Sequence, residues 1–364
     1  MSFKVAIVGL PNVGKSTIFK ALTKKQVDIA NYPFCTIEPN VGTVAVPDFR
    51  LEKLNDFYNS PKIVPTIIEF FDIAGLVKGA HEGQGLGNKF LSHIRETDAI
   101  CQVLRAFEDE NIIHVDGKIN PASDLETINL ELIFADMETV QKRIENLSRQ
   151  LKSSKDKNIV KTNDLLLKIK ENLEKGAAIR DLNLDIDEKK LIQDCNFLTI
   201  KPILYILNVL EGDIAEKKEK ILEKFNLKLN PEKVVLISAK IESELAELGK
   251  DEAINYLKEL GVEESGLDQL IKASYAELNL ITFFTAGPKE AHAWTLEKGL
   301  LAPQAAGKIH TDFEKGFIRA EVINWKDLID AGGDAGAKEK GLIRIEGKEY
   351  VVRDGDVVEI RFQI

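Results

Sequence analysis

Short apolar runs rich in β-branched side chains recur along the first three quarters of the chain. Runs this short, bounded by polar segments, are typical of buried strands rather than helices. The first run is followed by helical spacing at residues 18–22, and strands that alternate with helices favour a doubly wound α/β domain with a parallel sheet. The predicted strands cover residues 4–8, 41–46, 64–71, 99–104, 203–207 and 234–237.

A different periodicity interrupts this pattern after residue 129. Apolar residues follow one another at spacings of three and four, which is the a/d seam of a coiled coil. We predict an antiparallel helical hairpin that projects from the α/β domain, whose pattern returns at residue 201. A structural bundle and a partner-binding arm both stay open as its role. The seam positions are Leu130, Ile133, Met137, Val140, Ile144, Leu147 and Leu151, followed by Leu166, Ile169 and Leu173.

The C-terminal region alternates apolar and polar residues with a period of two, which predicts half-buried strands of a small sheet. A ubiquitin-like β-grasp domain fits this pattern. The predicted domains are residues 1–128 and 200–279 for the two parts of the α/β domain, 129–199 for the hairpin and 280–364 for the C-terminal domain. The alternating positions are Ile318, Ala320 and Val322, and then Val358, Ile360 and Phe362.

The loop after the first predicted strand carries phosphate-binding chemistry. Residues 9–16 read Gly-Leu-Pro-Asn-Val-Gly-Lys-Ser and match the pattern G-x-x-x-x-G-K-[ST] at every fixed position, between a strand and a helix. Its glycines let backbone N–H groups curl round phosphate oxygens at a helix N-terminus, which favours anions. Lys15 is expected to meet the β- and γ-phosphates and Ser16 to bind Mg²⁺. The expected nucleotide contacts here are Asn12, Val13, Gly14, Lys15, Ser16 and Thr17.

Two later elements complete the pattern of a nucleotide hydrolase. Thr36 lies in a polar loop before the second predicted strand, where it is expected to reach Mg²⁺ and to sense the γ-phosphate. Asp72 and Gly75 form a D-x-x-G element at the end of the third predicted strand. Asp72 can hold the Mg²⁺ shell, and the Gly75 N–H can reach the γ-phosphate. Ser16 and Thr36 are the predicted metal ligands, and Lys15, Thr36, Asp72 and Gly75 are predicted catalytic residues.

The composition limits the kinds of partner that the chain can be expected to bind. The 364-residue chain has a formal net charge of −10, which argues against nucleic-acid binding over the whole surface, so any RNA contact would be local. No run approaches the roughly 18 apolar residues of a membrane span, and the N-terminus leads straight into a strand, so we expect a cytoplasmic protein without a membrane partner. The three cysteines show no metal-binding spacing and are expected to be reduced thiols. A monomer is expected.

These motifs resemble the TRAFAC class of P-loop switches and, within it, the Obg-related branch, through Asn-Tyr-Pro-Phe-Cys-Thr at 31–36 and Asp-Ile-Ala-Gly-Leu at 72–76. In Ras-type GTPases a glutamine follows the D-x-x-G glycine and orients the attacking water. Leu76 cannot do this, so we expect slow hydrolysis by the isolated protein. His114, a bound cation or a partner would then activate the water, although a surface histidine without a role stays an alternative. Asn12 resembles the asparagine that coordinates K⁺ in related switches, so K⁺ is a candidate cofactor.

Recognition of the base falls on residues 208–211, which read Asn-Val-Leu-Glu where GTPases carry N-K-x-D. The aspartate of that motif accepts hydrogen bonds from two guanine donors that adenine lacks. The longer Glu211 shifts the carboxylate, and Val209 removes the lysine stem that packs over the base. Adenine is instead expected to meet the Asn208 side chain and backbone groups around Leu210. Ser238 begins Ser-Ala-Lys, the last element on the base side, so the expected base contacts are Asn208, Leu210, Glu211 and Ser238.

The combination of Asn-x-x-Glu, leucine after D-x-x-G and a coiled-coil insertion resembles the YchF, or Obg-like ATPase, family. The C-terminal region agrees, because Asp354-Gly-Asp-Val-Val358 and the segment 305–313 resemble the TGS domain that ends these proteins. The resemblance implies Mg²⁺-dependent hydrolysis of ATP in preference to GTP and association with ribosomes. A GTPase in ribosome assembly and a non-hydrolysing, nucleotide-dependent binding module stay open as alternatives.

Overall fold

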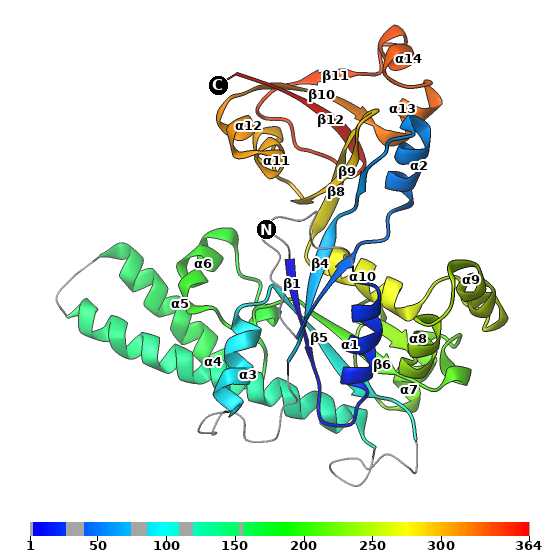
Figure 1. The fold of residues 1–364 in the computed structure, drawn as a ribbon. Helices are drawn as coiled ribbons and strands as arrows, with labels where there is room; N and C mark the ends of the chain where they lie inside the picture. The colour runs from blue at the N-terminus through cyan, green and yellow to red at the C-terminus, as the bar shows by residue number, and fades with distance from the viewer. Residues whose placement is uncertain (1–2, 27–39, 74–85, 109–118, 153–155, 364) are drawn as a thin grey trace.

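The larger sheet follows the alternating pattern of the sequence (Figure 1). The structure is a computed structural model that describes residues 3–26, 40–73, 86–108, 119–152 and 156–363. Six strands pair in the order β2-β4-β1-β5-β6-β7, and all run parallel except β2, which is antiparallel to β4. The predicted doubly wound domain is confirmed. Its strands are β1 (Phe3–Val8), β2 (Val41–Ala45), β4 (Ile67–Asp72), β5 (Ala99–Arg105), β6 (Ile203–Asn208) and β7 (Val234–Ile237).

Helices cover both faces of this sheet. The first and last helices of the domain, α1 and α10, lie on one face, and α3 with the start of α4 lies on the other (Figure 1). Their apolar faces and the sheet form one continuous core. Among the described helices, none combines the length and the hydropathy needed to cross a membrane. The helices are α1 (Lys15–Lys24), α3 (Leu86–Arg95), α7 (Lys218–Lys224), α8 (Ala239–Leu245), α9 (Lys250–Glu259) and α10 (Gly266–Glu277), with 3₁₀ turns η4 (Glu211–Asp213) and η5 (Pro231–Lys233).

The predicted hairpin is formed by α4 (Pro121–Leu151) and α5 (Lys157–Glu174), which extend away from the sheet (Figure 1). The first half of α4 packs on the sheet through residues such as Leu132, and the second half packs on α5 through Val140 and Leu147. The predicted seam is wrong at Leu130, which is 37% exposed, because α4 turns its buried face toward the sheet there. The helix continues across the predicted boundary at residue 129, so the domain limits stay a prediction. Three short elements, η2 (Ile179–Asp181), α6 (Ile186–Leu191) and η3 (Gln193–Cys195), lead back to β6.

A buried carboxylate fastens the hairpin to the sheet. Asp136 of α4 accepts hydrogen bonds from the Leu198 N–H at 2.8 Å and from the Thr199 N–H and hydroxyl, both at 2.7 Å. Burial raises the pKa of Asp136, and these three donors partly oppose that effect. Because Leu198 and Thr199 shortly precede β6, Asp136 links α4 directly to the entry of a central strand.

The C-terminal sheet has six strands in the order β11-β10-β12-β8-β9-β3, and α11 and α12 pack on one of its faces. This arrangement confirms the predicted C-terminal β-grasp domain. The predicted alternation is wrong at Ile318, which is 52% exposed, because a β-bulge between Phe317 and Arg319 shifts the register of β10 against β12. The elements are β8 (Leu280–Ala286), β9 (Ala291–Glu297), α11 (Ala302–Ile309), α12 (Thr311–Lys315), β10 (Phe317–Asn324), α13 (Trp325–Asp330), α14 (Asp334–Glu339), β11 (Arg344–Glu346) and β12 (Asp356–Phe362).

The last strand of this sheet comes from the N-terminal part of the chain. Between β2 and β4, residues 48–64 form α2 (Phe49–Tyr58) and β3 (Ile63–Val64), and we call this segment the inserted arm (Figure 1). β3 pairs in parallel with β9, and α2 covers the sheet face opposite α11. The strand predicted at 64–71 is therefore two strands in different sheets. Pro65 separates them, because proline has no N–H for a ladder hydrogen bond.

Polar contacts fasten the inserted arm to the C-terminal domain. The guanidinium of Arg50 pairs with Asp354 at 2.6 Å, and Asp354 also accepts the Thr282 N–H at 2.9 Å. Since Arg50 additionally pairs with Asp48, which caps α2, one network joins the start of the arm to β8. Further contacts are Tyr58 to Asp334 at 2.8 Å, the Ser60 hydroxyl to the Gly287 carbonyl at 2.7 Å and Lys62 to Glu290 at 2.6 Å.

Glu242 of α8 is a second buried carboxylate, placed beside the N-terminus of α10. It accepts the Gly266 N–H at 2.7 Å. Burial raises the pKa of Glu242 to about 7 from an ordinary 4.5, although Lys25 and the N–H donors oppose the shift and Asp268 adds to it. The folded protein therefore binds a proton at Glu242 more tightly than the unfolded chain does. This contribution to stability is complete below pH 4.5 and is lost as the pH rises through 7.

We expect Glu242→Gln to flatten the pH dependence of folding stability. Glutamine stays neutral and still accepts the Gly266 N–H, so the variant should gain about 1–3 kcal/mol relative to wild type between pH 4.5 and pH 7. Urea unfolding across this range measures the difference. Glu247→Gln, at an exposed position near the end of the same helix, is the matched control. Parallel pH curves for Glu242→Gln and wild type would show that Glu242 does not titrate as described.

Candidate nucleotide-binding site

The phosphate-binding loop connects β1 to α1 at the carboxyl end of the sheet, where α/β folds bind ligands. Its backbone needs two special residues. Gly14 has φ 95°, in the left-handed region that favours glycine, and Asn12 has φ 65°, which asparagine tolerates better than most residues. A Cβ on Gly9 would lie 2.9 Å from the Val13 side chain and 3.0 Å from the Val103 carbonyl oxygen. The loop therefore needs glycine at position 9, because any larger residue would contact Val13 of the loop and Val103 of β5 too closely.

The start of α1 is suited to an anion. No side chain caps the helix, and its first turn contains no acidic residue. The Thr17 and Ile18 N–H groups bond to the Gly14 carbonyl, which fixes the first turn. The N-terminal backbone N–H groups and the helix dipole then offer positive potential where a phosphate would lie.

Lys15 and Asp72 form an ion pair across the loop. Asp72 ends β4, directly beside Ile7 of β1, so the pairing of these two strands sets the position of both groups. Lys15 is buried, and Ser16 is exposed on the first turn of α1.

The oxygen donors beside the loop fit Mg²⁺, which prefers a carboxylate or hydroxyl together with substrate phosphate oxygens. Ser16 and Asp72 are the candidates that the structure describes. In the described part of the chain, no three His, Cys, Asp or Glu side chains gather into a metal cluster. A metal here would thus depend on phosphate oxygens and water as well as on the protein.

Asn208, at the end of β6, joins the phosphate loop to the base side of the site. Its amide nitrogen donates to the Val13 carbonyl at 2.9 Å, and its amide oxygen accepts the Ala239 N–H at 3.1 Å. The side chain is only 3% exposed. Asn208 therefore holds two loops together, which differs from the expectation that its side chain reads adenine.

A cavity of about 720 Å³ extends from the phosphate loop along residues 208–212. Leu210 and Phe107 supply apolar surface, and Phe107 is held in place because the Arg105 guanidinium donates to its carbonyl at 3.2 Å and lies over its ring. Glu211 and Lys240 pair at this cavity, and the pairing raises the pKa of Lys240. The cavity lining comprises Asn12, Gly14, Thr17, Phe107, Asn208, Val209, Leu210, Glu211, Gly212, Ser238, Ala239, Lys240 and Ser243.

The structure thus brings together most of the predicted nucleotide contacts. Three predicted residues, Thr36, Gly75 and His114, lie outside the described residues, as do Leu76 and Cys35. The sequence reasoning did not include Phe107, Lys240 or Ser243 in the site. Lys240 belongs to the Ser-Ala-Lys element and Phe107 shortly follows a predicted strand, so position relative to strand ends was the signal that could have found them.

The sheet, the loop and the cavity define a P-loop nucleoside triphosphatase. A family model described as 50S ribosome-binding GTPase matches residues 4–160, and a model of the YchF-GTPase C-terminal domain, described as a protein of unknown function, matches residues 280–363. The chain belongs to the YchF family. It is 56% identical to the ribosome-binding ATPase YchF of Bacillus subtilis and 50% identical to that of Escherichia coli O157:H7, over the full length of each chain.

A solved structure supports this assignment. The structure described as the Schizosaccharomyces pombe YchF GTPase superposes with a TM-score of 0.86 at 39% identity. The match covers 99% of this chain and 98% of that one. The similarity therefore includes the hairpin and the C-terminal domain as well as the P-loop domain.

Proposed function

We propose that the protein hydrolyses ATP to ADP and phosphate, in preference to GTP, and that its nucleotide state controls binding to the ribosome. The observation that carries the proposal is the joint placement of the phosphate loop, Asp72 and a base cavity whose acidic residue is paired with a lysine. The names of the Bacillus subtilis and Escherichia coli relatives, both ribosome-binding ATPases, support the substrate and the partner.

The ion pair between Lys15 and Asp72 supplies a simple binding step. Phosphate oxygens compete with the Asp72 carboxylate for the Lys15 ammonium, so Lys15 turns to the β- and γ-phosphates. Asp72 and Ser16 would then hold Mg²⁺, with Thr36 as the further predicted ligand. Phosphoryl transfer needs mainly such positioning and charge neutralisation, and Mg²⁺ supplies the neutralisation when bound.

Activation of water needs a group other than Leu76. His114 is the in-chain candidate, and K⁺ held near Asn12 is the other; Asn12 lines the cavity at its phosphate end. Exchanging K⁺ for Na⁺ in a turnover assay separates them, since only the second candidate predicts a loss of activity. A ribosome partner implies a cytoplasmic location, and we propose that the protein acts as a monomer.

The preference for ATP rests on Glu211. A guanine-reading carboxylate must be free to accept two hydrogen bonds, but Glu211 is engaged by Lys240. Leu210 and Phe107 supply apolar surface to the same cavity and accept either purine. Among the described residues, guanine therefore meets a carboxylate that Lys240 already engages, so its two donors gain less than they would from a free aspartate.

We expect Glu211→Asp combined with Lys240→Met to shift the preference toward GTP by tenfold or more, because the carboxylate is shortened and released from its partner. One regained charge-assisted contact is worth about 1.5–3 kcal/mol. Lysine at Val209, the residue that GTPases carry there, is unsuitable as a test because Val209 is buried in the core. Competition between labelled ATP and GTP measures the ratio. Lys218→Met is a control on the nearby α7, and an unchanged ratio in the double variant would remove Glu211 as the selector.

A GTPase is the second candidate, favoured by the description of the Schizosaccharomyces pombe structure as a YchF GTPase. A non-hydrolysing binding module is the third. Turnover of ATP and GTP, each with and without ribosomes, distinguishes all three. Faster GTP turnover supports the GTPase, and saturable ATP binding without phosphate release under either condition supports the binding module.

The hairpin tip is the proposed contact with ribosomal RNA. Lys152 ends α4, and Lys157 and Lys161 begin α5, all exposed on a chain with a net charge of −10. Lys155 carries the same charge but lies outside the described residues. Clustered lysines at the end of a projecting hairpin can reach phosphates without bringing the acidic domains close.

Reversing the tip charges, by Lys→Glu at 152, 155, 157 and 161, is expected to weaken ribosome binding at least tenfold and to reduce its salt dependence, since each lost phosphate contact lowers the salt slope by roughly one. Co-sedimentation at several salt concentrations provides the measurement. The same reversal at Lys168, Lys170 and Lys175, which are nearer the base of the hairpin, and at the exposed Lys220 of α7 is the matched control. Equal effects of the two sets would exclude a specific role for the tip.

A further inference from the structure

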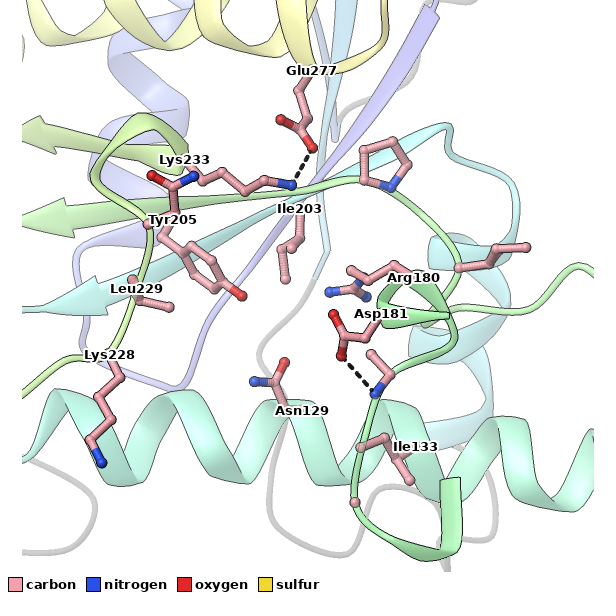
Figure 2. Close-up of a pocket in the computed structure, with 15 residues that line it drawn as sticks. Asn129, Ile133, Arg180, Asp181, Ile203, Tyr205, Lys228, Leu229, Lys233 and Glu277 are labelled. Carbon is pink, nitrogen blue, oxygen red and sulfur yellow. Dashed lines mark hydrogen bonds and ion pairs between the residues drawn. The ribbon is translucent and has the colours of Figure 1, made fainter. Parts of the chain in front are cut away.

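A second cavity lies at the opposite end of β6 from the nucleotide cavity (Figure 2). It measures about 500 Å³ and shares no lining residue with the nucleotide cavity. Its walls come from α4, η2, the start of β6 and the segment before β7. This size is in the range of small-molecule sites in proteins.

Arg180 of η2 is one of three cationic residues that line this cavity, with Lys228 and Lys233. The Thr199 carbonyl accepts both its backbone N–H, at 3.0 Å, and its Nε–H, at 2.9 Å. Its Nη2 is buried and has no hydrogen-bond partner among the described residues. Burial lowers the pKa of Arg180, although the charges of Tyr205, Asp181, Asp136 and Glu277 oppose the shift. The guanidinium is fixed at Nε, and Figure 2 shows it directed into the cavity. A guanidinium held in this way can offer its accessible N–H groups to an oxyanion.

Neutral polar groups face the same space. Figure 2 shows the Tyr205 hydroxyl, from β6, and the Asn129 amide, from α4, directed toward the region in front of the Arg180 guanidinium. A hydroxyl and an amide can each donate to an anion or accept from the rest of a ligand. The cavity therefore offers more than one direction of polar contact.

The carboxylates of the cavity already have protein partners. Glu277 pairs with Lys233 at 2.8 Å, and Asp181 accepts the Ala178 N–H at 3.1 Å. Lys228 lies exposed in the lining and adds positive charge. The lining carries three cationic side chains, Arg180, Lys228 and Lys233, against the two carboxylates, so its net charge is positive on a chain that is acidic as a whole.

We propose that this cavity binds a small molecule through a carboxylate or phosphate group, which Arg180 holds while Tyr205 and Asn129 contact the rest of the ligand. Both groups present planar or forked oxygens that match a guanidinium. The ligand would lie at the junction of the hairpin and the sheet, because Thr199, which holds Arg180, is itself bonded to Asp136 of α4.

Titration of the full-length protein with inorganic phosphate or with acetate tests the proposal. The protein is first saturated with ADP and Mg²⁺, so that the phosphate loop is occupied. We follow the thermal unfolding temperature and the Nε–H nuclear magnetic resonance signal of Arg180, which is assigned by its absence in Arg180→Gln. A saturable shift of both is expected. Saturation by phosphate alone assigns a phosphorylated ligand, and saturation by acetate alone assigns a carboxylate.

Variants separate this site from the nucleotide site. Arg180→Gln should abolish the saturable rise in unfolding temperature, Tyr205→Phe should weaken it several-fold, and Lys15→Ala should leave it unchanged. Arg149→Gln removes an exposed charge elsewhere on α4 and is the matched control. Tyr205→Phe loses only a hydroxyl, so it decides the question if Arg180→Gln does not fold. The proposal is overturned if neither anion saturates, or if Tyr205→Phe binds as tightly as wild type.

Discussion

Replacing Lys15 with alanine is expected to reduce ATP hydrolysis at least about 100-fold while the fold stays intact. The ammonium group contacts two phosphates in the proposed complex, and each charge-assisted contact contributes about 1.5–3 kcal/mol, which corresponds to roughly tenfold or more per contact. Release of phosphate from ATP under saturating conditions measures the effect. Lys15 belongs to the phosphate site rather than the core, because its ammonium group pairs with Asp72 beside the phosphate loop.

Lys20→Ala is the matched control, since Lys20 is an exposed lysine one turn further along α1. Its activity should equal that of wild type. Circular dichroism and thermal unfolding of Lys15→Ala should remain close to wild type, which separates loss of chemistry from loss of structure. Wild-type turnover by Lys15→Ala would disprove the assignment of the phosphate site and, with it, the proposed function.

Replacing Asp136 with alanine is expected to destabilise the protein by about 3–5 kcal/mol. The change removes the acceptor of three buried donors on Leu198 and Thr199, and each donor left without a partner costs about 1–3 kcal/mol. Urea unfolding at neutral pH measures this loss. Because these donors lead into β6, we expect the hairpin and the P-loop domain to be destabilised together.

Two further variants interpret that result. Asp187→Ala removes an almost fully exposed carboxylate and should change stability by less than about 0.5 kcal/mol. Asp136→Asn keeps one acceptor oxygen but turns an N–H₂ group toward a donor, so its loss should be intermediate. Equal stability of Asp136→Ala and wild type would mean that water replaces the carboxylate, and that the link between hairpin and sheet is weak.

The elements that the sequence predicted well are those whose chemistry is local. The phosphate loop requires glycine and lysine at fixed spacings, and the strands of the larger sheet are largely apolar, so both could be recognised without knowledge of the neighbours. The position of Asp72 followed from its strand. The proximity of Lys15 and Asp72 could not be predicted in this way, because it depends on the pairing of β1 with β4.

The elements that could not be predicted depend on distant partners. Leu130 and Ile318 fit their local periodicities, yet one lies where α4 turns toward the sheet and the other at a bulge. The contacts of Asn208 could not be predicted for the same reason, since only the folded chain shows that its amide bonds to Val13 and Ala239. Glu211 was singled out from the sequence, but its partner Lys240 lies in the first turn of α8 and could not be identified from the motif alone.

The inserted arm is translated long before the C-terminal domain on which it packs. Its contacts with the C-terminal domain span from 227 residues, between Ser60 and Gly287, to 304 residues, between Arg50 and Asp354. A ribosome making this chain therefore releases α2 and β3 long before the strands that cover them. Until β9 emerges, the apolar face formed by Leu51 and Leu54 has no partner. The larger sheet can pair β2 with β4 only if this segment loops out between them. The nascent chain therefore exposes the apolar face of α2 during most of translation, until the last quarter of the sequence buries it.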